Sequence, residues 1–101
     1  MNPGYIYILT NDRQTVLYIG STNDLRKRLT HHRHRLIPGF TRKYNVHRLV
    51  YYEQHADMDV ARQREHQLKD WSRAKKEALV AAKNPHRRDL FDETFSKGTE
   101  V

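Results

Sequence analysis

The chain has 101 residues, of which 37% are hydrophobic, so it is sufficient for one small domain with a single core and excludes a second domain. It contains no cysteine, which excludes a disulfide framework, a thiolate zinc site and a cysteine nucleophile. The formal net charge is +7, and no apolar run is long enough to span a membrane. The N-terminus lacks the features of a signal peptide, so we expect a cytoplasmic protein.

Two short tyrosine-bearing runs near the N-terminus predict a β-hairpin. Tyr5-Ile6-Tyr7 and Tyr18-Ile19-Gly20 lie in apolar runs rich in β-branched and aromatic residues, and the polar stretch 10–14 between them is typical of a turn. On a strand, side chains two residues apart share a face, so odd- and even-numbered residues of 5–9 point in opposite directions. We therefore expect Tyr7 and Tyr18 to meet on one side of the sheet.

A first helix is predicted over about 24–34, after the hairpin. Residues 21–24 supply possible N-caps, and Pro38-Gly39 ends the helix and opens a loop that contains residues 40–44. The apolar face of this helix is marked at helical spacing by Leu25, Leu29, His32 and Leu36.

Positive charge is concentrated in one segment, since no acidic residue occurs from Leu25 to Tyr52. Such a segment creates a field that attracts polyanions, and it favours nucleic acid over a solvated basic face or a ribosome-type or membrane-surface patch. Its Lys and Arg residues are Arg26, Lys27, Arg28, Arg33, Arg35, Arg42, Lys43 and Arg48.

The remaining elements predict an α/β fold of the α+β type. Residues 46–53 read as a third strand, and Asp57 or Asp59 can cap a helix that runs to Asn84-Pro85, with Ser72 able to divide it in two. We expect a small three-stranded antiparallel sheet flanked by three or more helices, with a core over 1–84 and a tail over 85–101. The tail packs in part through Leu90, Phe91 and Phe95 and frays at its end. The apolar stripe of the later helices is assigned to Val60, Ala61, Leu68, Trp71, Ala74, Ala78, Leu79 and Ala82.

Residues on the two predicted helices carry chemistry suited to a phosphodiester. Arg28 and His32 are four residues apart, so a guanidinium lies beside an imidazole on one helix face. Glu65 is a lone carboxylate in a basic and amide-rich run, and it could hold Mg²⁺ with waters completing the shell. The alternative is an ordinary helix salt bridge from Glu65 to Lys69 or Arg62.

Several short motifs follow one another along the chain in a specific order and spacing. They are Tyr5-Ile6-Tyr7, Tyr18-Ile19-Gly20, Ser21-Thr22 with Leu25, Arg28, Leu29 and His32, the run EHQLKDWSRAKKEAL over 65–79 after Ala61, then Asn84-Pro85 and Asp89-Leu90. In this arrangement the chain resembles the GIY-YIG nuclease superfamily over almost its whole length. It looks closest to the small stand-alone bacterial branch, which implies a single GIY-YIG domain. Tyr5 stands where the superfamily has glycine, and Arg87 where the branch tends to have tryptophan.

The resemblance implies a set of catalytic residues and a divalent metal, Mg²⁺ or Mn²⁺. One of Tyr7 and Tyr18 would activate or orient the attacking water, and Arg28 would face the scissile phosphate. A phenol is a weak base at neutral pH, so we expect Arg28 and the metal to favour its phenolate form. The remaining implied members are His32 one turn after Arg28, Glu65 as the metal ligand, and Asn84 as the late asparagine.

The expected activity is metal-dependent endonuclease cleavage of DNA with little sequence preference, on single-stranded or structured substrates, with RNA as a further candidate substrate. We expect a monomer without a small-molecule cofactor. The alternatives are a non-catalytic nucleic-acid-binding module on the same scaffold and an interaction protein whose tyrosines only pack. Stacking on bases is assigned to Phe40 and Tyr44, and phosphate contacts to Arg42, Lys43, Lys69, Arg73, Lys75 and Lys76.

Overall fold

The chain folds into a three-stranded sheet with helices on both faces, in a computed structural model that describes residues 2–34, 36 and 39–92. The hairpin of β1 (Gly4–Thr10) and β2 (Leu17–Thr22) is followed by α1 (Leu25–Arg33) and a short α2 (Phe40–Lys43). β3 (Arg48–His55), α3 (Met58–Lys69) and α4 (Arg73–Lys83) complete the order. The strands lie in the order β2-β1-β3, and both pairs are antiparallel. The predicted fold class is therefore confirmed.

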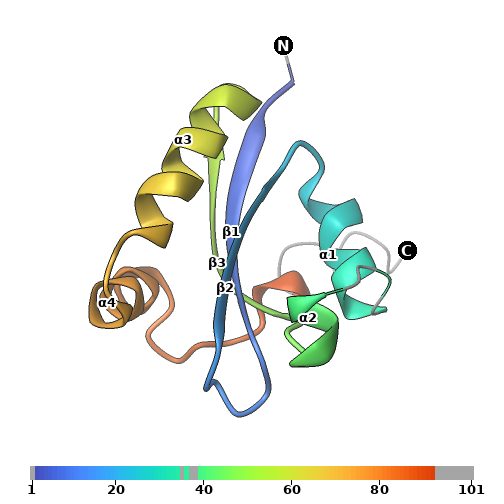
Figure 1. Cartoon of the computed structure of the whole chain (residues 1–101), viewed down its shortest axis with the longest axis vertical. Coiled ribbons are helices and arrows are strands. Elements are labelled where there is room, and N and C mark those ends of the chain that lie inside the picture. Colours follow the sequence, from blue (N-terminus) through green and yellow to red (C-terminus); the bar gives the residue numbers. More distant parts are fainter. Residues whose placement is uncertain (1, 35, 37–38, 93–101) are drawn as a thin grey trace.

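The sheet separates two layers of helices, with α3 and α4 on one face and α1 and α2 on the other (Figure 1). The even-numbered Ile6 and Ile8 pack with α3 and α4 in one core, whereas Tyr7 and Leu9 lie in a second core on the α1 side. Successive side chains of β1 thus point to opposite faces of the sheet, as the strand period predicted, and Tyr7 points toward α1.

Side-chain caps fix where the helices begin. The carboxylates of Asp24 and Asp57 accept hydrogen bonds from the backbone amides at the starts of α1 and α3, and the hydroxyl of Ser72 does so for α4. The sequence allowed Asp57 or Asp59 as the cap of the helix after β3, and Asp57 is the cap observed for α3. Ser72 caps α4, so this stretch forms two helices where one continuous helix was equally allowed.

The segment after α1 differs from its prediction. Residues 40–43 form a helical turn where a loop was expected, and β3 begins at Arg48, two residues later than predicted. Asn45 adopts a left-handed φ of 55°, and the amides of Val46 and His47 bond the carbonyls of Thr41 and Thr10. These bonds hold 44–47 as a connection before the strand can start. Leu36 is 65% exposed because α1 has already ended, and Pro38 and Arg35 lie outside the described residues.

The predicted apolar stripe is correct for Ala61 and Leu68 of α3 and for Leu79 of α4, which packs against the core, and wrong for the alanines of α4. Ala61 and Leu68 are fully buried, but Ala74, Ala78 and Ala82 are exposed, and Val80 is the fully buried residue of α4. The break at 70–72 resets the helical phase, so the spacing measured along α3 does not continue into α4. Val60, also assigned to the stripe, is 41% exposed near the start of α3.

The segment after α4 crosses to the α1 face of the sheet. Leu90 and Phe91 pack against the core there, and Asp89 forms an ion pair of 2.7 Å with Arg33 of α1. Phe95 and the rest of 93–101 lie outside the described residues. Within 2–34, 36 and 39–92, no helix has the length and apolar character that crossing a membrane requires.

We predict that Leu68→Ala lowers the free energy of unfolding by about 2–5 kcal/mol, because it opens a cavity in the core beneath α3. Ala78→Gln, on the exposed side of α4, should change it by no more than about 0.5 kcal/mol. Urea denaturation followed by circular dichroism measures both. A larger loss for Ala78→Gln than for Leu68→Ala would contradict the packing described here.

Candidate active site

Three aromatic side chains from three different elements meet on the α1 face of the sheet. The ring centroid of Tyr7 on β1 lies 6.4 Å from that of Tyr18 on β2, and the imidazole of His32 on α1 lies 5.7 Å from each. Tyr7 and His32 are buried, whereas Tyr18 is half-buried. The expected meeting of the two tyrosines is therefore observed, with His32 as the third member.

Gly20 leaves the room that the Tyr7 phenol occupies. The two residues face each other across the β1–β2 pair. A Cβ atom at position 20 would lie 2.5 Å from the Tyr7 hydroxyl oxygen, closer than real contacts allow. The glycine that closes the second tyrosine motif is thus required by the close approach of the catalytic candidate.

A chain of hydrogen bonds runs from the phenol into α2. The Tyr7 hydroxyl lies 3.1 Å from Nε2 of His32, and Nδ1 of His32 lies 3.2 Å from the hydroxyl oxygen of Thr41. All three side chains are buried. Each polar atom of this chain therefore has a partner, as buried polar groups require.

Burial keeps the phenol and the imidazole of this pair uncharged at neutral pH. Burial, reinforced by Tyr18 and Glu65 and opposed by Arg28, raises the pKa of Tyr7 above its ordinary value. Burial, together with the positive charges of Arg28 and His31, lowers the pKa of His32 to about 4. Arg28 favours the Tyr7 phenolate, as expected, but the desolvation of the phenol outweighs that charge and the net shift of the pKa is upward.

Glu65 lies on α3, on the other side of the sheet, and points at the edge strand β2. Its carboxylate accepts a hydrogen bond from the Ser21 hydroxyl and pairs with Lys69 Nζ at 2.7 Å. Burial raises the pKa of Glu65, but the bonds from Lys69 and Ser21 outweigh it and the net shift is downward. The salt-bridge alternative from the sequence is thus realised with Lys69, while Arg62 pairs with Asp59.

The donor set at Glu65 fits a hard divalent cation that keeps most of its water. The carboxylate and the Ser21 hydroxyl are oxygen donors of the kind that Mg²⁺ and Mn²⁺ prefer, and magnesium commonly uses one or two protein carboxylates. Among the residues described, no group of three or more His, Cys, Asp or Glu could hold a metal. A metal at this position would therefore depend on Glu65, and it would compete with Lys69.

Arg28 lies in a groove that passes around the outer edge of β2. One hollow of about 400 Å³ is lined by Arg28, Thr22 and Asn23 with α1 residues. An adjoining hollow of about 230 Å³ shares those three residues and reaches Ser21 and Arg62 on the α3 side. The exposed Arg28 guanidinium therefore lies between His32 on one face of the sheet and Glu65 on the other.

Asn84 does not join the other predicted catalytic residues. Its side-chain amide donates to the carbonyls of Val50 and Arg88 and accepts from the Arg88 amide. It is 3% exposed, at the end of α4 beside β3. These contacts assign Asn84 to the turn that carries the chain across the sheet, and they correct its placement in the site.

The predicted nucleic-acid contacts fall on two opposite faces. Phe40, Arg42, Lys43 and Tyr44 are exposed on and beside α2, next to the tyrosines. Arg73, Lys75 and Lys76 lie on α4, on the other face of the sheet (Figure 1). Arg73 bonds the carbonyls of Thr15 and Gln14, and Lys75 lies 4.2 Å from the Trp71 ring. The α2 group and Lys69, which pairs with Glu65, are therefore the predicted contacts that adjoin the site.

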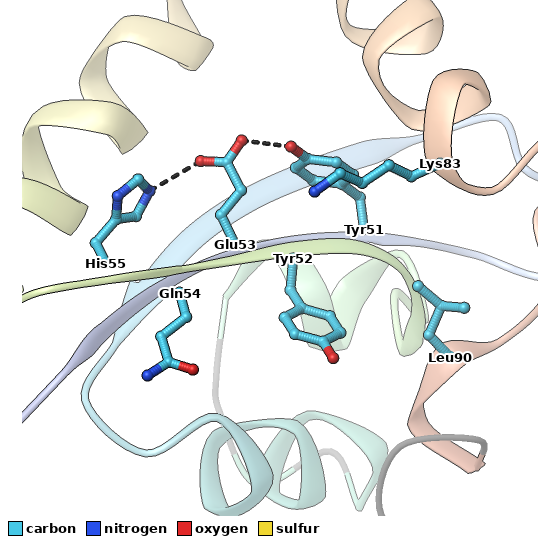
Figure 2. Close-up of a pocket in the computed structure, with 7 residues that line it drawn as sticks. All are labelled: Tyr51, Tyr52, Glu53, Gln54, His55, Lys83 and Leu90. Carbon is cyan, nitrogen blue, oxygen red and sulfur yellow. Dashed lines mark hydrogen bonds and ion pairs between the residues drawn. The ribbon is translucent and has the colours of Figure 1, made fainter.

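A second polar cluster lies along β3, in a hollow of about 490 Å³ (Figure 2). Figure 2 shows Tyr51, Glu53 and His55 on one side of the strand and Tyr52 and Gln54 on the other. Glu53 accepts hydrogen bonds from Tyr51, His55 and Arg64. Burial raises its pKa, but these bonds bring it down to about 2. Because Arg64 belongs to α3, the cluster joins that helix to the sheet and is assigned to the fold.

Two residues of the site were not predicted from the sequence. Ser21 contacts Glu65, and Thr41 contacts His32. Ser21 directly follows the second tyrosine motif, and its position on the β2 edge was a usable signal once Glu65 was assigned. Thr41 gave no such signal, because its contact depends on a helical turn that the pattern did not predict.

Comparisons with known proteins find a matching family model and similar proteins. A family model described as the GIY-YIG catalytic domain matches residues 3–78. A UPF0213 protein of Natronomonas pharaonis is 39% identical over 77 residues, covering 76% of this chain and 89% of that protein. One from Bacillus pumilus is 37% identical over 76 residues, covering 75% and 76%. The solution NMR structure of a UPF0213 protein of Bacillus halodurans is similar with a TM-score of 0.56 at 28% identity, covering 91% of this chain and 97% of that one.

We predict that Asn84→Asp lowers the free energy of unfolding by about 1–3 kcal/mol, because the carboxylate keeps the shape of the amide but loses its donors to Val50 and Arg88. Thermal and urea unfolding measure the loss. Unchanged stability in this variant would contradict the assignment of Asn84 to the turn.

Proposed function

Because this chain belongs to the GIY-YIG family, whose domain is a nuclease domain, we propose that it hydrolyses phosphodiester bonds in DNA with Mg²⁺ or Mn²⁺ as cofactor. The observation that carries the proposal is the buried contact of Tyr7 with His32, beside Tyr18 and within the fields of Arg28 and Glu65. This arrangement combines a proton acceptor, a fixed cation and a metal-binding carboxylate, which are the groups that such hydrolysis requires.

Tyr7 and His32 would handle the proton of the attacking water. In the tautomer that carries its proton on Nδ1, His32 accepts a hydrogen bond from the Tyr7 hydroxyl at Nε2 and donates one from Nδ1 to Thr41. A proton from the attacking water would pass through the Tyr7 hydroxyl to Nε2 of His32 in one concerted transfer, which leaves hydroxide to attack phosphorus without a separate Tyr7 phenolate. His32 is neutral before the transfer, so its imidazole has a free nitrogen to accept that proton, and its lowered pKa makes it a weak base in this role.

Arg28 and Tyr18 would bind and orient the phosphate and the water. The Arg28 guanidinium lies in the groove at the β2 edge, where it can offset charge that builds on the phosphate oxygens. Tyr18 is half-buried beside the Tyr7–His32 pair, and its hydroxyl would hydrogen-bond a water or a phosphate oxygen.

Glu65, supported by Ser21, would hold the metal. A bound Mg²⁺ or Mn²⁺ supplies Lewis-acid stabilisation of the leaving 3′ oxygen. The hydrogen bond from Ser21 would orient the Glu65 carboxylate, because a carboxylate that binds a metal is commonly held in place by a hydrogen bond from a neighbouring residue. Since one carboxylate leaves the ion mostly hydrated, we expect weak binding and activity at about millimolar metal.

The substrate proposed is single-stranded or structured DNA, cut with little sequence preference, and RNA is a second candidate. A 12.1 kDa domain offers little surface for reading a long duplex. The basic segment 25–52 supplies phosphate contacts, which give affinity without base information. We propose that the protein acts as a cytoplasmic monomer without a small-molecule cofactor.

We predict that Glu65→Gln or Arg28→Ala reduces cleavage of labelled oligonucleotides about 100-fold or more, and that EDTA abolishes wild-type cleavage. Circular dichroism should show that both variants stay folded, since neither residue belongs to the buried core. Arg13→Ala, which removes one exposed charge in the β1–β2 turn, is the matched control and should cut normally.

Two outcomes of that assay would overturn the proposal. Undiminished cutting by the Glu65→Gln protein would exclude Glu65 as the metal ligand. Tight oligonucleotide binding by the wild type without cutting, with every divalent metal tested, would identify the non-catalytic binding module instead.

We predict that Lys69→Met binds Mn²⁺ up to about fivefold more tightly, because the lysine no longer competes for the Glu65 carboxylate. Titration followed by the electron paramagnetic resonance signal of free Mn²⁺ measures this directly. Lys83→Met, which removes the same charge on α4, should leave Mn²⁺ affinity unchanged. Weaker binding by Lys69→Met than by wild type would count against competition.

A further inference from the structure

The aromatic ladder that leads out of the site is formed by Tyr18, Phe40 and Tyr44. The Phe40 ring stacks on Tyr18 with 6.1 Å between centroids and 23° between planes, and Tyr44 packs on Phe40 at 4.7 Å. From the proposed nuclease function and this geometry, we infer that the ladder is a subsite for the bases of unpaired nucleotides next to the scissile phosphate.

The outer part of the ladder is exposed to solvent in a way that the fold does not require. Phe40 is 47% exposed and Tyr44 44% exposed, whereas their neighbour Thr41 on α2 is buried. Leu36, 65% exposed, lies on the same segment. In the described part of the chain, only Val60 is a further large apolar residue with comparable exposure. A cluster of exposed rings in one segment marks a binding surface more often than scattered exposed residues do.

Two contacts hold the ladder in register with the candidate catalytic groups. Thr41, the second residue of α2, bonds Nδ1 of His32, and Phe40, the first residue, stacks on Tyr18. α2 is therefore anchored to α1 and β2, two of the elements that carry the site. A base on the exposed side of Phe40 or Tyr44 would be placed a short and fixed distance from the Tyr7–His32 pair.

The surroundings of the ladder suit a polyanion. Arg42 and Lys43 are exposed on the same helix, and Lys43 Nζ lies 5.4 Å from the Tyr44 ring. The segment 25–52 contains no acidic residue that would repel phosphate. Flat aromatic faces beside cationic side chains are the combination by which proteins bind single-stranded nucleic acid, since every base offers a face to stack on.

Stacking on the ladder distinguishes between classes of substrate. Bases in a duplex are covered by their neighbours, so Phe40 and Tyr44 can receive only a base that is unpaired or at an open end. The ladder therefore favours cleavage beside single-stranded segments, such as overhangs, flaps and loops, over cleavage within a continuous duplex.

The test measures stacking directly, from the fluorescence of 2-aminopurine placed at one position of a single-stranded oligonucleotide and of a matched duplex. All variants are made in the Glu65→Gln protein, which should bind these oligonucleotides without cutting them. We expect this protein to quench 2-aminopurine fluorescence, and Phe40→Leu and Tyr44→Leu to abolish most of the quenching. We also expect these changes to weaken single-strand affinity by about 5- to 150-fold, with little change for duplex. Val60→Ala, at an exposed apolar residue on the other face, is the control and should behave like its parent.

Three results would overturn the inference. The first is that both leucine variants keep the quenching and the single-strand affinity of their parent. The second is that these variants lose the same factor of affinity for single strand and for duplex. The third is that the protein binds an acidic protein surface and does not bind the oligonucleotides. The inference fails alone if wild type cuts DNA and the leucine variants bind like their parent. The proposed function fails alone if 2-aminopurine is quenched through Phe40 and Tyr44 but the wild type never cuts.

Discussion

The buried hydrogen bond between Tyr7 and His32 is the interaction on which the arrangement of the site depends. The Tyr7 side chain is buried against Gly20, so leaving its hydroxyl without a hydrogen-bond partner would cost more than the bond itself contributes. His32 meets that need from α1, and Thr41 meets the need of His32 from α2. One polar requirement on β1 thereby determines where two helices lie.

The location of the site follows from the strand order. β2 is an outer strand, so α1 on one face and α3 on the other can both extend side chains past it. Arg28 belongs to α1 and Glu65 belongs to α3, and Ser21 of β2 contacts Glu65. A central strand would have separated these two charges by a layer of backbone. Catalytic candidates that are far apart in sequence are therefore brought together at an edge of the sheet, where its backbone does not divide the two layers.

Local patterns predicted the strands, the caps and the meeting of the tyrosines, because these depend on the two-residue strand period and on nearby amides. Contacts made by non-local packing were out of reach. The helical turn at 40–43 is held by Thr41 against His32, and no spacing signals that bond. The alanine stripe failed on α4 because Ser72 restarts the helix in a new phase. Asn84 had a plausible motif position, yet its partners Val50 and Arg88 assign it to a turn.

The crossing of residues 84–89 around β3 has a consequence for how the molecule behaves among its copies. An open strand edge offers unpaired amides and carbonyls to which another chain can add a strand, a route to aggregation. Here the Asn84 amide occupies the Val50 carbonyl, and the Asp89 carboxylate occupies the Leu49 amide. A foreign strand must displace both side chains before it can extend the sheet at that end of β3. The sheet is thus protected on the β3 side, while the β2 side stays accessible to substrate.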